Sequence, residues 1–571
     1  MKIRQVRVSN FRGIETLEWN VPTENIVCLI GKGDSSKTTI LDAIQFAFHP
    51  HWNLSFSDSD FYQGNIENDI VIEVTIGDLP DEFFQITKYG QHLRGWNSET
   101  LTLEDEPRDE IENVLTVSLN VCSDLEPKWR VINARTPEGV EFRTSDRQKV
   151  SVSMIGTYTS RQLSWANGSP LTNLTSDTNL NGSLIQASRS ARQSLDANRS
   201  SLECFDNAAV LTHEVALSLG ITTSGAYKAH LDSNSINIHT GGLALHDGDV
   251  PVKQLGLGSR RMLLCGIQAK CLLPNHITLI DEIESGLEPH RITRLLKHLS
   301  KDLSGQYFIT THSSTVLKEL KCSNLNVVHQ DAGVLQIKNA SNQTLDELGI
   351  QGKIRDLSEA FLARKVIICE GATEVGFLRG FDDYKLDNGF EPMSYHGVQL
   401  VDARGAKNIV SIANTFKALN YQVAVFADSD SPDNFSEQDE ARLNASGIKV
   451  VTWAENLAIE QRVIRDISWE HVLLSLDFAR DKLNVDVWSH VTNAYQGSIP
   501  KEHSEWVDNE KYRISIGLAA KKRGWYKNIA NGEEWCAVVS PCFGNTKINT
   551  SDLVNKLNEV WEFVVYAPAA T

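Results

Sequence analysis

The chain has 571 residues, 41% of them hydrophobic and 22% charged, and a formal net charge of −18. This length exceeds what one hydrophobic core usually supports, so we expect two or three domains. No apolar run approaches the ~20 residues of a membrane-spanning helix. The nine scattered cysteines include no Cys-x-x-Cys pair, which argues against a disulfide framework or a structural zinc. A cytoplasmic protein without a membrane partner is expected.

The N-terminal segments alternate between strand and helix patterns. Residues 1–8 alternate charged and apolar side chains as a strand does, unlike a secretion signal. Residues 25–30 form a short apolar run typical of a buried strand, and residues 38–48 have helical apolar spacing. Strand-like segments follow at 70–76 and 114–121, which predicts a β-rich subdomain joined to an α/β fold.

Residues 144–250 interrupt this alternation with a polar stretch rich in Ser, Asn and Thr. Helical character runs from about 184 to 219. We interpret the stretch as an insertion, a helical arm for dimerisation. From 251 to 345 the alternation of helix and strand returns, with buried strands at 277–280 and 307–310.

Residues 346–363 are predicted to form a helical connector to a second α/β unit, while the Trp-rich C-terminal part gives no clear pattern. Alternating strands and helices predict a mainly parallel sheet with helices on its faces. The fold prediction is an α/β multidomain protein with regions at 1–345 and 364–571. The strands of the second region are expected at 365–369, 398–402, 422–427 and 449–453.

Residues 31–38, Gly-Lys-Gly-Asp-Ser-Ser-Lys-Thr, have the composition of a phosphate-binding loop. Gly31 and Gly33 give the backbone freedom to turn its N–H groups toward phosphate. Lys37 supplies a charge for the outer phosphates and Thr38 a hydroxyl for Mg²⁺. Ser36 stands where glycine is usual, a departure that alters the loop geometry or weakens binding.

Further phosphate-handling residues follow along the chain. The apolar strand at 277–280 ends in Asp281 and Glu282, suited to hold Mg²⁺ through water and to orient or deprotonate the attacking water. His312 follows another strand, where it can contact a γ-phosphate. A helix start with glycines and a serine hydroxyl offers one more anion-binding arrangement, at Gly256, Gly258 and Ser259.

This set resembles the ABC ATPases, specifically the branch close to SMC and double-strand-break-repair ATPases. The resemblance implies bound ATP and head-to-head dimerisation, in which the Ser259 region of one protomer completes the site of the other. It also adds Arg12, Ser36 and Thr39 to the nucleotide-binding residues. The matching segments are the opening motif at 10–14, Walker A at 31–38, a diverged signature at 254–260, Walker B at 277–282, the D-loop at 285–290 and the switch histidine His312.

A second site is predicted after the strands of the C-terminal region. Glu370 follows one strand and Glu374 lies one helical turn later, while Asp428 and Asp430 follow another strand. The carboxyl ends of parallel strands form the edge where ligands bind. Oxygen ligands of this kind suit Mg²⁺ or Mn²⁺, and two such ions ~4 Å apart can activate water against a phosphodiester.

These acids resemble the Toprim domain, in which Glu370 matches the glutamate and Asp428 with Asp430 the Asp-x-Asp motif. A Toprim domain behind an ABC ATPase resembles the OLD (overcoming lysogenization defect) nuclease family, which includes the nuclease of the Gabija antiphage system. That resemblance implies another glutamate and a lysine. Glu460 fits the glutamate better than Glu455, with both positions open, and Lys527 fits the lysine.

The leading interpretation is a metal-dependent DNA endonuclease or nickase whose ATPase dimer regulates cutting, in antiphage defence by resemblance. The net charge of −18 opposes nucleic-acid binding. Bound metal ions would cancel part of this charge, and a local basic strip, Lys521 to Arg523 with Lys527, is enough to contact phosphates. A DNA-bridging or partner-loading ATPase with a non-cleaving Toprim module stays open. So do an RNA or tRNA substrate and a helicase-like or reverse-transcriptase partner.

Overall fold

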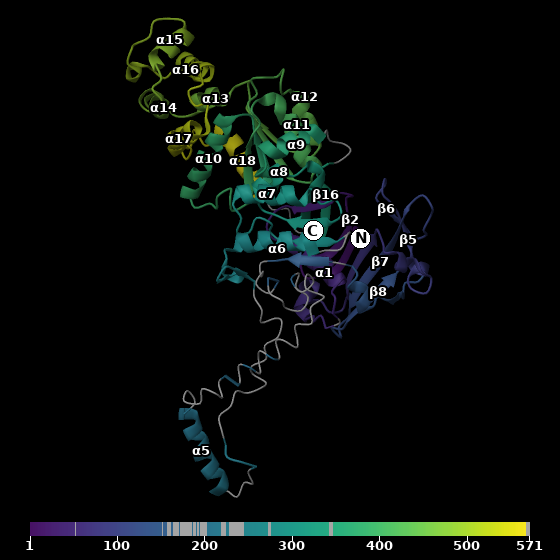
Figure 1. Cartoon of the computed structure of the whole chain (residues 1–571). Helices are drawn as coiled ribbons and strands as arrows, with labels where there is room; N and C mark the ends of the chain where they lie inside the picture. Colours follow the sequence, from purple (N-terminus) through teal and green to yellow (C-terminus); the bar gives the residue numbers. More distant parts are fainter. Residues whose placement is uncertain are drawn as a thin grey trace. The chain divides into compact units, whose positions relative to one another are not determined.

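The computed structural model divides into two compact units, one made of residues 1–150 and 306–571 and the other of residues 151–305 (Figure 1). No helix in the part of the chain that the structure describes is long and apolar enough to cross a membrane. The described residues are 1–51, 53–150, 152–156, 162–163, 171, 186, 190, 193–194, 203–218, 224–227, 245–271, 276–341 and 347–566.

The N-terminal part of the first unit is built on a mixed sheet. Its strands are β1 (Lys2–Phe11), β2 (Ile14–Asn20), β3 (Ile26–Ile30), β4 (Ile70–Gly77), β5 (Arg94–Asn97), β6 (Thr102–Glu104), β7 (Glu112–Val121), β8 (Pro127–Ile132), β9 (Val140–Glu141), β14 (Gln306–Thr310), β15 (Leu325–Asp331) and β16 (Val334–Asn339). Within this unit the order runs β14-β3-β15-β16-β2-β1-β4-β7-β5-β6, with β8 on β7 and β9 on β8. The strands predicted near 25–30, 70–76, 114–121 and 307–310 are confirmed.

Parallel pairing places the phosphate-binding loop. All of β3 is buried, as expected for an apolar strand between parallel neighbours, and β3 is parallel to both β14 and β15. The loop after β3 leads directly into helix α1 (Lys37–Ala47). Since the apolar residues Ile40, Leu41 and Ile44 of α1 are buried, packing fixes the position of the helix N-terminus.

The hairpin of β15 and β16 contacts the loop that precedes the C-terminal strand at 422–427. The His329 imidazole hydrogen bonds to the carbonyl of Leu419. The Lys338 ammonium donates to Asn420 Oδ1 at 2.8 Å, and the Asn420 amide donates to Gln336 Oε1 at 3.0 Å. These contacts join the two sheets of the first unit.

The C-terminal sheet consists of β17 (Lys365–Cys369), β18 (Val398–Asp402), β19 (Gln422–Ala427) and β20 (Lys449–Thr452). Its order is β18-β17-β19-β20, and each pair is parallel. The predicted parallel sheet and the places of its strands are therefore confirmed. The helices that precede and accompany it are α8 (Ser314–Glu319), α9 (Glu347–Asp356), α10 (Ala372–Asp387), α11 (Ile409–Ala418) and α12 (Glu437–Ala445).

The Trp-rich C-terminal part, for which the sequence gives no pattern, is helical. Its helices are α13 (Ile459–Asp466), α14 (Trp469–Asp481), α15 (Val487–Tyr495), α16 (Glu510–Arg523), α17 (Ile529–Val539) and α18 (Asp552–Val565), and Figure 1 shows α14, α15, α16 and α17 gathered together. Aromatic packing joins them to helix α10. The buried rings of Tyr526 and Trp535 stack at 3.9 Å between centroids, and Trp535 also meets Phe377 of α10 edge-on.

The second unit contains a parallel pair of strands, β10 (Val152–Ile155) and β13 (Ile277–Ile280), the latter as predicted. Helix α6 (Leu257–Cys271) precedes β13 in the chain, and helix α7 (Pro289–Leu299) follows it. The described elements within the predicted insertion at 144–250 are α2 (Thr144–Arg147), β10, helix α5 (Glu203–Ser218) and the short pair β11 (His246–Asp247) and β12 (Val250–Pro251). Much of the insertion lies outside the described residues. Its role in dimerisation and the predicted domain boundaries stay predictions.

Helices α10 and α17 pack closely because glycines face the contact. A Cβ on Gly376 would lie 2.1 Å from the carbonyl oxygen of Ile529, and one on Gly532 would lie 2.8 Å from that of Thr373. Backbone atoms cannot yield as the end of a flexible side chain can. The close approach fixes α10, which carries Glu374, against the C-terminal helices.

We therefore expect Gly376→Ala to destabilise the protein by about 1–3 kcal/mol, the usual cost of overpacking. The matched control is Gly352→Ala on α9, where a Cβ would meet nothing within 4 Å; it should be neutral or stabilise by up to ~1 kcal/mol through helix propensity. Thermal unfolding of both variants checks the prediction. Equal melting temperatures would contradict it.

Candidate metal centre and phosphate-binding loop

A group of carboxylates, here called the acidic cluster, lies at the carboxyl edge of the C-terminal sheet. Oxygens of Glu370, Asp428 and Asp430 all lie within 4.8 Å of one another. Neighbouring parallel strands bring them together, since Cys369 at the end of β17 pairs with Phe426 of β19. The cluster comprises Glu370, Glu374, Asp428, Asp430 and Glu460, all of them predicted site residues.

The turn after β17 orients Glu370 and Glu374. Glu374 is only 5% exposed, and its Oε2 accepts a hydrogen bond from the Gly371 N–H at 2.8 Å. This contact closes the N-terminus of α10 as a capping residue does. The Glu370 carboxylate accepts from the Asp428 N–H at 3.2 Å. Backbone donors thus fix both side chains.

Asp428 is held by two donors that sequence reasoning missed. Its Oδ1 accepts from the Trp453 indole N–H and from the Ile459 N–H, both at 2.9 Å. Trp453 directly follows β20, and Ile459 is the first residue of α13. An aromatic residue after the last strand of a sheet is the only sequence signal, and it equally well marks a core residue.

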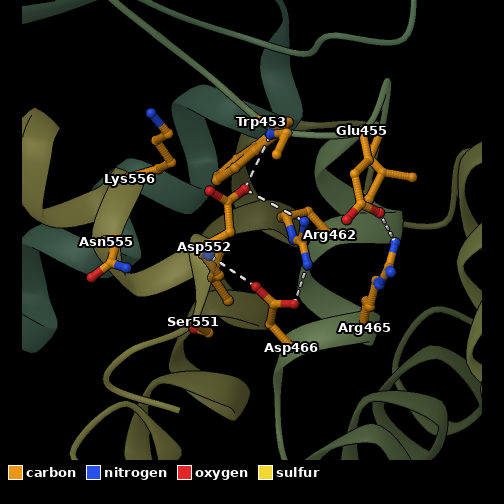
Figure 2. Close-up of polar contacts among 12 residues, drawn as sticks. Trp453, Glu455, Arg462, Arg465, Asp466, Ser551, Asp552, Asn555 and Lys556 are labelled. Carbon is orange, nitrogen blue, oxygen red and sulfur yellow. Dashed lines mark hydrogen bonds and ion pairs between the residues drawn. The ribbon is translucent and has the colours of Figure 1, made fainter.

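The two glutamates left open by the sequence lie in different surroundings. Glu455 is exposed, and its carboxylate pairs with Arg465, as Figure 2 shows. Glu460, in the first turn of α13, is only 6% exposed, and its charge raises the pKa of both Glu374 and Asp428. Among the two, Glu460 is the one that the structure places with the acidic cluster.

Two lysines bring positive charge to the cluster. Lys521, in the last turn of α16, forms an ion pair with Asp430. Lys527 follows the helix end at Gly524, which has a φ of +61°. Burial raises the pKa of Glu460, and the charge of Lys527 offsets part of that rise. Only Lys527 was predicted as a site residue. Lys521 belongs to a basic run at a helix end, a pattern more typical of solvent-exposed positions.

Burial and mutual repulsion disfavour ionisation of the cluster. Burial, followed by the charge of Asp430, raises the pKa of Glu370 to about 7. Burial and the charge of Glu460 raise the pKa of Glu374 to about 8. Burial also raises the pKa of Asp428 well above its ordinary value. A bound divalent cation would relieve this repulsion, and carboxylate oxygens are the donors that Mg²⁺ and Mn²⁺ prefer, so the residues fit such a metal.

The phosphate-binding loop wraps around the lysine predicted for it. Lys37 is buried, and its ammonium donates to the carbonyls of Gly31 and Lys32 at 3.1 and 2.8 Å and to the Ser35 hydroxyl at 3.1 Å. Gly31 has a φ of +143°, and a Cβ there would lie 2.6 Å from the Val328 carbonyl oxygen. The remaining residues predicted in this segment are Gly33, in the loop, and Thr38 and Thr39, in the first turn of α1.

Ser36 takes the backbone conformation that glycine would otherwise supply. Its φ is +59° and its ψ 23°, in the left-handed region that costs a non-glycine residue roughly 1–2 kcal/mol. Its hydroxyl donates to Gln330 Oε1 at 3.2 Å, and a Cβ on Gly13 would lie 2.7 Å from that hydroxyl. Gly13 and Gln330 therefore accommodate the serine, and the loop keeps its turn.

The other predicted residues of the first unit lie around this loop. The Arg12 guanidinium donates to Asp60 at 2.9 Å and to Asp42, and it lies 5.0 Å from the centre of the Phe11 ring. His312 is exposed two residues after β14, the strand beside β3.

In the second unit, Asp281 and Glu282 follow β13 directly. The buried Arg261 donates to both of their carbonyls, and the Ser285 hydroxyl donates to Glu282 Oε2 at 2.9 Å. Glu282 has a φ of +46°. These contacts fix the turn in which both acids lie.

The segment that contains Gly256, Gly258 and Ser259 packs against the D-loop of the same unit. A Cβ on Gly258 would lie 2.0 Å from the Gly286 carbonyl oxygen, so only glycine fits there. The Ser259 hydroxyl accepts from the Arg291 guanidinium at 3.3 Å.

Three family models match parts of the chain. One described as an AAA ATPase domain matches residues 1–85, and one described as an AAA domain, putative AbiEii toxin, Type IV TA system, matches residues 228–318. The model of the overcoming lysogenization defect (OLD) protein-like TOPRIM domain matches residues 361–430. The chain thus carries matches to AAA ATPase domain models, followed by a match to an OLD-like TOPRIM domain model. The TOPRIM match ends at Asp430, so it includes four acids of the cluster but not Glu460.

Solved structures and curated proteins add little to this assignment. The SMC head domain from Thermotoga maritima matches at 15% identity with a TM-score of 0.28, covering 59% of this chain and 99% of that chain. The Smc head domain of Pyrococcus furiosus bound to the C-terminal domain of ScpA matches at 13% identity with a TM-score of 0.34, covering 59% and 95%. No curated protein matches significantly.

The raised pKa values predict how the stability of the metal-free protein depends on pH. The folded state binds more protons than the unfolded state between pH 4.5, the ordinary glutamate value, and the raised values of about 7 and 8. The free energy of unfolding should therefore fall as pH rises through this window. Melting temperatures in EDTA between pH 5 and 8.5 check the sign, and Mn²⁺ should stabilise more at pH 8 than at pH 5.

Glu374→Gln should flatten this dependence, whereas Glu455→Gln, which lies outside the cluster, should leave it unchanged. If the melting temperature stays constant or rises across the window, and the two variants behave alike, the carboxylates do not carry the raised pKa values.

Proposed function

We propose that the TOPRIM domain is a metal-dependent endonuclease or nickase that acts on DNA and that ATP bound by the AAA region regulates cleavage. The observation that carries the proposal is the gathering of Glu370, Asp428 and Asp430 within 4.8 Å, with Lys521 paired to Asp430. Divalent ions such as Mg²⁺ require oxygen ligands. A phosphodiester that is being cleaved is stabilised by positive charge beside it.

The acidic cluster would hold Mg²⁺ or Mn²⁺, which supply an activated water and offset negative charge on the reacting phosphate. The side chains around the cluster determine how well its acids are placed. Trp453 and the Ile459 N–H keep one oxygen of Asp428 fixed. Lys527 and Lys521 bring positive charge to the edge where a phosphate would lie.

Substrate binding needs a local source of positive charge, because the whole chain carries −18. Lys521, Lys522 and Arg523 end helix α16, and Lys527 follows after one turn. Lys522, Arg523 and Lys527 are exposed, and their neighbour Lys521 pairs with Asp430 of the cluster. A strip of this kind suits contact with the backbone phosphates of a nucleic acid.

The AAA region would bind ATP through the loop of Lys37 and Thr38, with Asp281 and Glu282 serving magnesium and hydrolysis. We infer a homodimer in which Ser259 of one protomer completes the partner's site. The OLD-like TOPRIM domain supports a role in antiphage defence, alone or with a helicase-like or reverse-transcriptase partner.

Purified protein should convert supercoiled plasmid to the nicked form in Mg²⁺ or Mn²⁺. Asp428→Ala should lower the rate by more than the roughly 10–100-fold typical of losing a group that only supports a metal ligand. Glu455→Ala, which removes a nearby exposed carboxylate, should cleave at the normal rate. Agarose gels of a time course provide the measurement.

The nuclease assignment is wrong if the plasmid stays intact or if Asp428→Ala nicks it as fast as the unsubstituted protein. Parallel reactions with single-stranded DNA, duplex RNA and tRNA identify the substrate. Reactions with and without ATP, repeated with Lys37→Ala, separate regulation from cleavage: that variant should bind less ATP and no longer respond to it.

A further inference from the structure

A short segment carries both donors that hold Asp428. It begins with Trp453, whose indole donates to Asp428 Oδ1, and it ends with Ile459, whose N–H donates to the same oxygen. Glu460 comes next. In the middle, Leu457 exchanges hydrogen bonds with Ser429, the residue between the two aspartates. The position of this segment therefore sets the geometry of much of the cluster.

One carboxylate at the start of the last helix contacts the beginning of this segment and the helix that follows it. Asp552 Oδ2 accepts from the Ala454 N–H at 3.1 Å, next to Trp453. The same oxygen lies 3.4 Å from the guanidinium of Arg462, on the helix that carries Ile459 and Glu460. Figure 2 shows the contact between Asp552 and Arg462.

The contacts of Arg462 make this link rigid. Its side chain is 6% exposed and also pairs with Asp466, whose other oxygen accepts from the Leu553 N–H at 2.9 Å. Asp552 and Asp466 thus both pair with the buried Arg462 guanidinium, and each also accepts a hydrogen bond from a backbone N–H group. Removal of one partner of a buried ion pair leaves the other charge uncompensated, so the arrangement resists small displacements.

We propose that Asp552 is a positioning residue for the TOPRIM metal centre. It acts through the segment 453–460: the carboxylate fixes where Trp453, Ile459 and Glu460 lie, and these fix Asp428 and complete the acidic cluster. The inference rests on the proposed function, because it assigns a role in the same site. It also gives the C-terminal helix α18 a part in metal binding.

The test measures Mn²⁺ binding to the full chain by titration calorimetry, without nucleic acid. Asp552→Ala should weaken Mn²⁺ binding by about 10–100-fold, as expected for loss of a residue that supports metal ligands. Asp552→Asn can still accept the hydrogen bond from the Ala454 N–H but has no charge to pair with Arg462. Its affinity for Mn²⁺ should therefore lie between that of the unsubstituted protein and that of Asp552→Ala. The matched control is Glu559→Gln, which removes a carboxylate on the same helix that pairs with Lys449 and Lys556.

Two further measurements separate positioning from general damage. ATP binding at the Lys37 loop should be unchanged in each variant, and excess Mn²⁺ should restore much of the cleavage rate of Asp552→Asn. The proposal is overturned if both Asp552 variants bind Mn²⁺ within twofold of the unsubstituted protein, if Glu559→Gln weakens binding equally, or if the unsubstituted protein binds no Mn²⁺. If metal binding responds as expected but no substrate is cut, the positioning role stands and the nuclease assignment fails.

Discussion

The TOPRIM region depends on keeping several like charges close together and away from water. Burying one carboxylate is costly, and burying several in contact adds Coulomb repulsion. The surrounding structure offsets part of this cost with donors: backbone N–H groups for Glu370 and Glu374, an indole and an N–H for Asp428, and a lysine for Asp430. Burial and the neighbouring charges still raise the pKa of Glu370 and of Glu374, so part of this cost remains uncompensated.

The nucleotide loop follows a different constraint, that of backbone conformation. A serine in the left-handed region is strained, yet Ser36 is tolerated because Gly13 leaves room for its hydroxyl and Gln330 Oε1 accepts a hydrogen bond from it. A departure from the usual loop sequence is thus matched by residues far away in the chain. The local motif alone could suggest a defective loop, whereas the surrounding contacts keep its turn.

The strands of the C-terminal sheet were predictable because each is a buried apolar run with a sharp polar end. The strands at 365–369, 398–402 and 422–427 have the predicted bounds. The same property put Asp428 at a strand end, where a ligand edge forms. The helices after residue 466 gave no such signal, because buried polar residues such as Ser475 and Ser515 interrupt their apolar pattern.

The parts of the site that the sequence did not reveal arise from tertiary contacts. The sequence around Lys521 predicts a solvent-exposed helix end, whereas the fold places this lysine in an ion pair with Asp430. The sequence around Trp453 predicts a core residue, whereas in the structure its indole N–H donates a hydrogen bond to Asp428. The choice between Glu455 and Glu460 depends on which way the start of α13 turns, and spacing along the chain carries no information on that.

Two neighbouring residues of strand β15 contact two different regions of the protein. Gln330 contacts the nucleotide loop at Ser36, and its neighbour His329 contacts the Leu419 carbonyl beside the TOPRIM sheet. Successive side chains of a strand point to opposite faces, so moving the strand by a single position would separate both residues from these partners. An insertion or deletion in β15 would consequently harm both regions at once.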